Sequence, residues 1–420
     1  MLTPEYLLHV TEGAEEIAEE LHNDILARII ERIVIRFNRG DKYILTATDK
    51  WKIEVLQEAG YLLDGIQKEI AKKTPYMEKE IAQAMEDAGV RAIAYDNAIY
   101  EAVGLPAVDV TKSPYMTRLL QRNYEATAGE FHNFTRTMAE AAQQTYVKAV
   151  DKAYMQVMSG AVSSSQAVKE SVNAIAKDGV KVQYPSGHTD TIETATARAV
   201  RTGISQGSAQ IQLARMKEDG DSLVVTSSHM GARPTHDVWQ GKVFSINWDK
   251  LAQVYPLPDI PTPQSDAKMM AKYPDFVDST RIGQVDGLCG ANCRHSFSVF
   301  FEGMANPFEQ YGTEENKKAY DLQQRQRAME RRIRKTKREA MALNTARENA
   351  TGESKEAFEQ QYQKKAALLS QQNAEYNKFC KETGLKRQSE RLQIAKWDRS
   401  QAAKARAAAQ KYEQREGTAK

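Results

Sequence analysis

The sequence predicts a mainly α-helical protein with one small α+β domain. Apolar residues recur at helical spacing through the first half of the 420 residues, and β-branched runs appear between about 180 and 305. With 8% aromatic and 41% hydrophobic residues, the composition favours long helices over a β-sandwich or barrel. We therefore expect three consecutive parts: a helical N-terminal array at 1–178, an α+β domain at 179–306 and a basic helical tail at 307–420.

The N-terminal array is predicted to begin with a long amphipathic helix. Thr3 followed by Pro4 is a typical cap and first turn. One apolar residue then follows every four positions, which places one stripe on the helix: Ile17, Leu21, Ile25, Ile29 and Ile33. Gly40 is a typical stop because glycine tolerates the left-handed conformation that ends helices.

More helices are expected in the rest of the N-terminal array. Asp49 can cap a second helix, and a third is predicted to open at Pro75 and to end near Gly89. One or two long helices should follow from Pro114, and Ser163 can cap the next one. No internal repeat of fixed period is visible, so a solenoid is not indicated.

The pattern changes to short strands in the middle of the chain. Residues 180–184 alternate with period two before a Pro-Ser-Gly turn, and a helix then runs to about Asp219. β-branched or alternating runs predict three further strands at 223–227, 241–246 and 297–301. These elements make a small α+β domain.

The tail after Pro307 is rich in helix-forming residues, with predicted breaks at Gly352 and Gly384. Apolar residues near heptad spacing form a seam: Phe358, Tyr362, Leu369, Tyr376 and Phe379. Because Lys365 and Gln372 interrupt this seam, it predicts a single long helix or a weak coiled coil.

Several classes of protein are excluded by composition. No stretch approaches ~18 consecutive apolar residues, so no membrane-spanning helix is expected. The acidic N-terminal sequence lacks the basic and apolar regions of a secretory signal. Three cysteines in 420 residues do not make a disulfide scaffold and fit synthesis in a reducing cytoplasm.

Charge is distributed unevenly along the chain. Between Glu314 and Lys420 there are 26 basic and 15 acidic residues, a net charge of +11, and the remaining 32 basic and 41 acidic residues give −9. Eight cations fall within 14 residues: Arg325, Arg327, Arg331, Arg332, Arg334, Lys335, Lys337 and Arg338. Such a helix can bind a phosphate backbone, and it lacks the aromatic residues that stack on bases. A solvated or partner-docking helix face is the equally weighted alternative.

Cysteines and histidines gather in two segments of the α+β domain, at 229–237 and 286–295. They can converge only if the two segments are neighbours in the sheet. One interpretation is a zinc site with two thiolates and two imidazoles: His236, Cys289, Cys293 and His295. The spacing Cys-x3-Cys-x-His is not that of a standard zinc finger.

Two other interpretations of these residues stay open. Cys289 or Cys293 could act as a nucleophile with His236 as its base, although no known nucleophile signature surrounds them. The favoured interpretation is structural. In it His236 and Arg233 hydrogen-bond loop carbonyls and carboxylates such as that of Asp286, and the cysteines are small buried hydrophobes or pair after release from the cell.

Two motifs in the α+β domain resemble a known family. The segment 231–244 resembles the Arg-x-x-His-x-x-x-x-Gly core of the Mu F-like phage head morphogenesis domain, and 287–295 resembles its closing Asn-Cys-Arg segment. The matching positions are Arg233, His236, Gly241, Asn292, Cys293 and Arg294. With its helical N-terminal half and acidic start, the chain is similar to the phage minor capsid protein 2 family.

This resemblance implies a minor head protein of a tailed phage or prophage. It would be made in the host cytoplasm and located in the virion. It would contact the portal protein and capsid or scaffold subunits, and its basic tail could reach packaged double-stranded DNA. No catalytic residue and no cofactor follow from the resemblance, and the matching positions are expected to define the fold. The alternatives are a cysteine- or zinc-dependent hydrolase and a nucleic-acid-binding protein unrelated to phage.

Overall fold

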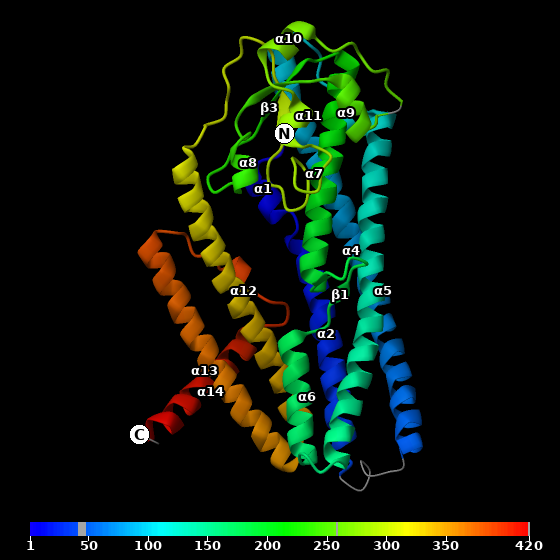
Figure 1. Cartoon of the computed structure of the whole chain (residues 1–420), viewed down its shortest axis with the longest axis vertical. Helices are drawn as coiled ribbons and strands as arrows, with labels where there is room; N and C mark the ends of the chain where they lie inside the picture. Colours follow the sequence, from blue (N-terminus) through cyan, green and yellow to red (C-terminus); the bar gives the residue numbers. More distant parts are fainter. Residues whose placement is uncertain (41–47, 258, 419–420) are drawn as a thin grey trace. The chain divides into compact units, whose positions relative to one another are not determined.

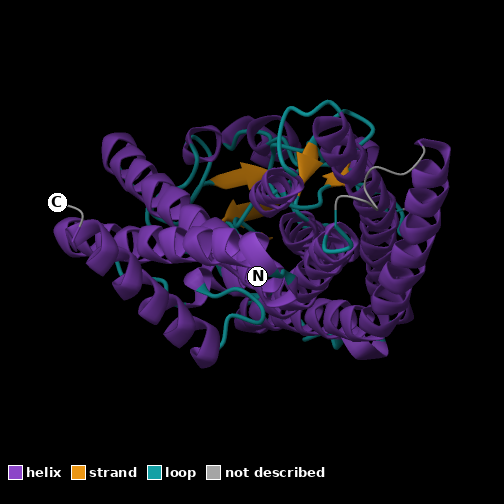
Figure 2. Ribbon diagram, turned by 90° about the horizontal axis from the view of Figure 1, so that it is seen from below, coloured by secondary structure: helices purple, strands orange, loops and turns teal. Residues whose placement is uncertain are grey.

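The computed structural model describes residues 1–40, 48–257 and 259–418, and these are mostly helical with a few short strands (Figures 1 and 2). The α-helices are α1 Pro4–His9, α2 Glu12–Phe37, α4 Thr48–Ala102, α5 Pro114–Met158, α6 Ser164–Asp178, α7 Ile192–Asp219, α8 Pro234–Asp237, α9 Trp248–Val254, α10 Ala267–Lys272, α11 Phe276–Thr280, α12 Thr313–Asn349, α13 Gly352–Thr383 and α14 Arg399–Thr418. The strands are β1 Val182–Gln183, β2 Thr189–Asp190, β3 Leu223–Thr226, β4 Val243–Ser245 and β5 Phe297–Val299. No helix in these described ranges has the length and apolar character needed to cross a membrane. The predicted class, mainly α with a small α+β part, is confirmed.

The chain forms two compact units, each assembled from separate stretches of sequence. The first unit comprises Met1–Glu15, Tyr76–His132 and Thr196–Gln323. The second unit comprises Glu16–Pro75, Asn133–Ala195 and Gln324–Lys420. The division of the sequence into domains at residues 178 and 306 stays a prediction.

The expected first helix is present but is broken near its start. The Thr3 hydroxyl oxygen accepts the backbone N–H of Tyr6 at 3.1 Å, as a helix cap should. α1 then ends at His9 and α2 begins at Glu12, which is a break that the sequence pattern did not predict. Four of the five residues of the predicted apolar stripe of α2, Leu21, Ile25, Ile29 and Ile33, have no exposed surface, and Ile17 is half-buried.

The prediction of a helix boundary at Pro75 is wrong. α4 is one continuous helix of 55 residues with Pro75 inside it, and it passes Gly89 without ending. Buried residues at helical spacing continue on both sides of the proline, with Leu62 and Ile66 before it and Met77 after it. Packing of this stripe outweighs the cost of about 3 kcal/mol that an internal proline imposes.

Three predicted strands form one antiparallel sheet in the order β4-β3-β5. Val224 of the central strand pairs with Phe244 on one side and with Val299 on the other. Thr226, the last residue of β3, pairs with Phe297, the first residue of β5. The segment that leaves β3 therefore starts beside the segment that enters β5. The expected hairpin also forms, but only as the short pair β1 and β2.

A buried carboxylate ties helices of the first unit to this sheet. Asp96 of α4 is 1% exposed and accepts hydrogen bonds from Ser298 Oγ at 2.6 Å and from Gln212 Nε2 at 2.8 Å. Gln212 of α7 also donates to the backbone oxygen of Phe297 at 2.9 Å. β5 is thus held by side chains from two helices as well as by β3.

The tail forms three helices, α12, α13 and α14, which are separated at the two predicted breaks and so do not make one long C-terminal helix. Gly352 and Gly384 stand at the predicted breaks with φ of 55° and 71°, a left-handed conformation that glycine adopts readily. The seam residues Tyr362 and Tyr376 are buried, and the Tyr376 hydroxyl donates to Glu330 Oε1 of α12 at 2.9 Å. The apolar seam therefore packs against helices of the same chain.

The second unit contains a buried group of charged side chains. Glu193 lies 3.0 Å from His22 Nδ1 and 2.8 Å from Arg338 Nη2, and Arg338 also pairs with Glu19 at 3.2 Å. Burial alone would raise the pKa of Glu193, but the charges of His22 and Arg338 outweigh it and hold that pKa well below its usual value. The carboxylate is therefore ionised throughout the neutral range.

We predict that Glu193→Gln destabilises the protein at neutral pH by about 3 kcal/mol, because it leaves Arg338 buried with one partner fewer. The folded pKa of Glu193 lies below the unfolded value, so its contribution is present above about pH 4.5 and is lost as the pH falls. In thermal unfolding, the difference in Tm between wild type and variant should shrink below that pH. Glu382→Gln, in an exposed pair with Lys378, is the matched control. Equal effects of the two substitutions would contradict the prediction.

Candidate functional site

The two cysteine- and histidine-bearing segments meet at one end of the sheet in the first unit. Beyond the last paired residues of β3 and β5, the Ser227 N–H donates to the Ser296 oxygen at 2.8 Å, and the Ser296 N–H donates to Ser227 Oγ at 3.0 Å. The connection from β3 to β4 contains α8, which holds His236, and the segment before β5 holds Cys293 and His295. The condition that the segments be neighbours in the sheet is met.

Tight turns shape the segment before β5. A Cβ atom at Gly290 would lie 2.4 Å from the Val285 oxygen, and one at Gly287 would lie 1.9 Å from the Arg281 oxygen. Both positions therefore need glycine. Cys289 and Asn292 adopt left-handed backbone conformations with φ of 58° and 57°. In this tightly turning segment the Cys293 side chain is buried.

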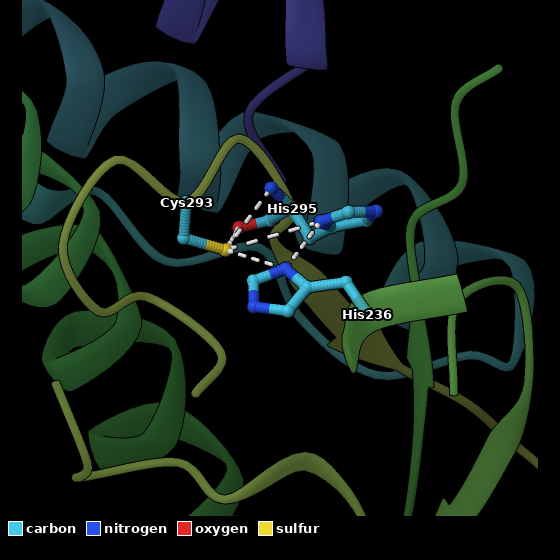
Figure 3. A group of neighbouring side chains, drawn as sticks. All are labelled: His236, Cys293 and His295. Atoms are coloured by element: carbon cyan, nitrogen blue, oxygen red, sulfur yellow. Dashed lines mark hydrogen bonds between the residues drawn. The ribbon is translucent and has the colours of Figure 1, made fainter. Parts of the chain in front are cut away.

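Three side chains converge in this region: His236, Cys293 and His295 (Figure 3). The two Nδ1 atoms are 3.2 Å apart, and Cys293 Sγ lies 3.8 Å from one and 3.9 Å from the other. Each residue is only 1% exposed. Within the described ranges, this is the group whose potential metal-ligand atoms all lie within 4.8 Å of one another, and it does not include Cys289.

The far nitrogens of both imidazole rings have hydrogen-bond acceptors. His236 Nε2 lies 2.9 Å from the backbone oxygen of Asp286, and His295 Nε2 lies 3.2 Å from Gln240 Oε1. The orientation of the Gln240 amide is fixed by two further bonds. Its oxygen accepts the His229 N–H at 3.0 Å, and its nitrogen donates to Asp237 at 3.1 Å. Both histidines therefore carry a proton on Nε2.

Burial sets the protonation of the three side chains. It lowers the pKa of His236 to about 4 and that of His295 well below its usual value, with the nearby His229 adding to the second effect. Burial also raises the pKa of the Cys293 thiol. Both imidazoles are neutral at physiological pH. A buried cysteine with a raised pKa is a poor nucleophile.

Aromatic rings enclose the three side chains. The Trp239 ring centroid is 4.5 Å from that of His236 and 4.8 Å from that of His295. The His229 ring stacks on His295 at 4.4 Å. Trp239 thus packs against both imidazole rings.

The other motif residues hold the surrounding loops together. Arg233 Nη2 donates to the Ala291 oxygen at 2.9 Å, which joins the two motif segments. Gly241 has a φ of 66°, and Asn292 Oδ1 lies 3.5 Å from Arg201 Nη1. Arg294 follows Cys293 directly and takes part in interactions of its own. The contacts of Arg233 agree with a role in defining the fold.

Two residues of this region were not identified from the sequence. Gln240 orients His295, and Asn316, in the first turn of α12, holds the loop before α8. Asn316 Oδ1 accepts the N–H groups of Gly231 and Ala232 at 2.8 and 2.9 Å, and its Nδ2 donates to the Ala232 oxygen at 2.9 Å. Gln240 lies inside the motif, so its position was a signal. Asn316 is about 85 residues from its partners and had none.

The predicted nucleic-acid-binding cations of α12 do not all face solvent. Four are exposed, namely Arg325, Arg331, Arg332 and Lys335, and Arg327 and Arg334 are half-buried. Lys337 is 7% exposed, and burial lowers its pKa to about 8. It lines a cavity of about 530 Å³ with Trp397 and Arg387. Arg338 is engaged with Glu19 and Glu193. The assignment of Lys337 and Arg338 to a DNA-facing surface is therefore corrected, because both serve internal packing of the second unit.

Comparison with known proteins identifies the family of this chain. The sequence model described as "Phage minor capsid protein 2" matches residues 2–381. The chain belongs to this family. A protein of Lactococcus phage LL-H described as a structural protein is 23% identical over 298 residues, which are 69% of this chain and 76% of that protein. No solved structure matches the chain. The chain is therefore a phage structural protein of the minor capsid class, and its place is the virion.

We predict that Asn316→Leu destabilises the first unit by about 3 kcal/mol, because three buried backbone groups lose their hydrogen-bond partner. The variant should show a lower Tm and faster amide hydrogen exchange in residues 229–237. Asn377→Leu, at an exposed position of α13, should leave both unchanged. Similar exchange rates in the two variants would show that Asn316 does not hold this loop.

Proposed function

We propose that this minor capsid protein acts at the portal vertex of the phage head, where its acidic helical part contacts portal or capsid subunits and its basic tail contacts packaged DNA. The main support for a role in the phage head is the family match over residues 2–381. The charge separation along the chain supports two different kinds of partner. A Mu F-like fold for the α+β part is included in this proposal.

The exposed cations of α12 support the DNA contact. At 100° per residue, Arg325, Arg331, Arg332 and Lys335 fall within about one third of the helix circumference, so they share a face. The single acidic residue among them, Glu330, is 3% exposed and turns inward to Tyr376 and Arg391. It therefore does not neutralise the cationic face, in which Arg332, alone of these four described residues, has an ion pair, with Glu375 at 2.8 Å. Since no aromatic residue lies among these cations, binding would act on phosphates and be independent of sequence.

We predict that the full chain binds duplex DNA with an affinity that falls as salt rises, because phosphate contacts release counterions. Arg331→Gln with Lys335→Gln should lower the slope of log K against log salt by about 1.8, from two lost contacts. Lys50→Gln with Lys52→Gln removes the same charge from exposed positions of α4 and is the control. Equal slopes for the two double variants, or wild-type binding that does not depend on salt, would contradict the DNA contact.

We predict that the protein is present in purified DNA-filled particles at a few to some tens of copies, as quantified by mass spectrometry against the portal and major capsid proteins. A ratio that tracks the portal, together with chemical crosslinks to portal subunits, is the expected result. Absence from both filled particles and empty proheads, or crosslinks to the major capsid protein alone, would overturn the portal assignment.

The cysteine-nucleophile form of the hydrolase alternative finds no favourable observation in the described residues. A nucleophilic cysteine works as an accessible thiolate of lowered pKa. Cys293 is instead 1% exposed and its thiol pKa is raised. Cys289 is 2% exposed, and burial raises its pKa further. The family is one of structural capsid proteins, which points the same way.

A further inference from the structure

The converging nitrogens of His236 and His295 present an electrostatic conflict. Both rings carry their proton on Nε2, because Nε2 faces the Asp286 oxygen in one and the Gln240 amide oxygen in the other. In the neutral rings both Nδ1 atoms then expose lone pairs. These lone pairs face one another at 3.2 Å in a region that is 1% exposed. Two buried acceptors at that distance repel unless a proton or a metal ion lies between them.

The geometry of the three side chains matches that of a tetrahedral metal centre. Zinc bonds of about 2.05 Å to nitrogen and about 2.3 Å to sulfur give tetrahedral edges of about 3.3 Å between two nitrogens and about 3.6 Å between nitrogen and sulfur. The corresponding distances are 3.2 Å between the Nδ1 atoms and 3.8 and 3.9 Å from Cys293 Sγ. The sulfur needs to move only a few tenths of an ångström toward the two nitrogens to reach the tetrahedral distances.

We propose that a zinc ion binds between His236 Nδ1, His295 Nδ1 and Cys293 Sγ. Mixed imidazole and thiolate donors suit zinc, whereas magnesium and calcium take oxygen donors. Binding replaces the thiol proton of Cys293, which is released to solvent, so the sulfur coordinates as a thiolate. This proposal does not depend on the portal or DNA assignments.

The groups around the three ligands already have the arrangement that orients metal ligands. Each ring donates its remaining N–H to an oxygen, to Asp286 from His236 and to Gln240 from His295. The backbone N–H of His295 points at Cys293 Sγ at 3.4 Å and can stabilise a thiolate. Metal-bound histidines almost always have such outer partners, which fix the ring and the tautomer.

Cys289 is not one of the ligands in this proposal. Its side chain is buried in the apolar cluster that also contains Leu288 and Phe276. It is absent from the group of ligand atoms that lie within 4.8 Å. Zinc takes four donors, so the fourth is a non-protein ligand such as water.

The proposed ion would join two segments that are far apart in sequence. His236 lies 57 residues before Cys293, and the backbone contacts of Ser227 with Ser296 bring the two segments alongside each other. Because the ligands exist as a set only in the folded chain, binding free energy adds to folding stability. The zinc ion would clamp the connection between β3 and β4 to the segment before β5.

The first test is cobalt titration of the full chain after removal of metal. Cobalt takes the same ligands as zinc, and a thiolate ligand gives a charge-transfer band in the near ultraviolet. One equivalent of cobalt should produce this band together with the visible bands of a tetrahedral site, and one equivalent of zinc should abolish both. Wild-type protein that takes up neither metal, or a cobalt spectrum without a thiolate band, would overturn the proposal.

Variants then assign the ligands. Cys293→Ser should lose the charge-transfer band and stoichiometric zinc, whereas the matched control Cys289→Ser, also buried, should keep both. Gln240→Leu should weaken cobalt binding about 10- to 100-fold while leaving the band in place, because it removes only the outer partner of His295. Loss of the band in Cys289→Ser with retention in Cys293→Ser would contradict the assignment. Far-ultraviolet circular dichroism checks that each variant is folded.

Discussion

The antiparallel pairing of β3 with β5 is the interaction on which the first unit depends. It joins Thr226 to Phe297 and continues through the contacts of Ser227 with Ser296. Strands that are about 70 residues apart in sequence thereby place their connecting segments side by side. Without the pairing of β3 with β5, the segments that carry His236 and His295 would not lie side by side. The helices reinforce the same strand, since Asp96 and Gln212 bind its side chains and backbone.

The second unit depends on a different physical constraint, the neutralisation of buried charge. Glu193 and Glu19 share Arg338, and His22 completes the group. Isolated charges would be costly in this environment, so the chain pairs them. The same requirement turns Arg338 and Glu330 of α12 inward, and Lys337 is buried against Trp397 with its Nζ donating to the Leu392 oxygen. What remains on the surface is a narrower cationic face than the sequence suggested.

Much of the fold could be predicted because local signals decided it. The strands of the sheet were predicted from β-branched runs, and the helix breaks at Gly352 and Gly384 from glycine in the tail. Local signals failed where packing overrode them. Pro75 lies within a continuous helix because buried residues on both sides hold it there. The packing of the tail helices against one another depends on the burial of Tyr362 and Tyr376, which no local rule requires.

The candidate site was only partly predictable for a related reason. Three of the four residues that the sequence offered as zinc ligands do converge, because their segments flank paired strands. Cys289 lies outside that group, since the turn around Gly290 directs it to the apolar cluster. Asn316 was missed because its hydrogen-bond partners, Gly231 and Ala232, lie about 85 residues away in the sequence. The sequence named four candidate residues, and the tertiary structure brings three of them together.

The central claim is that a cation belongs between the two facing imidazole nitrogens and the thiol. Anomalous diffraction from crystals of the full chain, measured on both sides of the zinc absorption edge, tests it most directly. We predict a single strong anomalous peak within bonding distance of His236 Nδ1, His295 Nδ1 and Cys293 Sγ. Crystals grown with zinc that show no peak there, with the two Nδ1 atoms still facing each other, would contradict the claim.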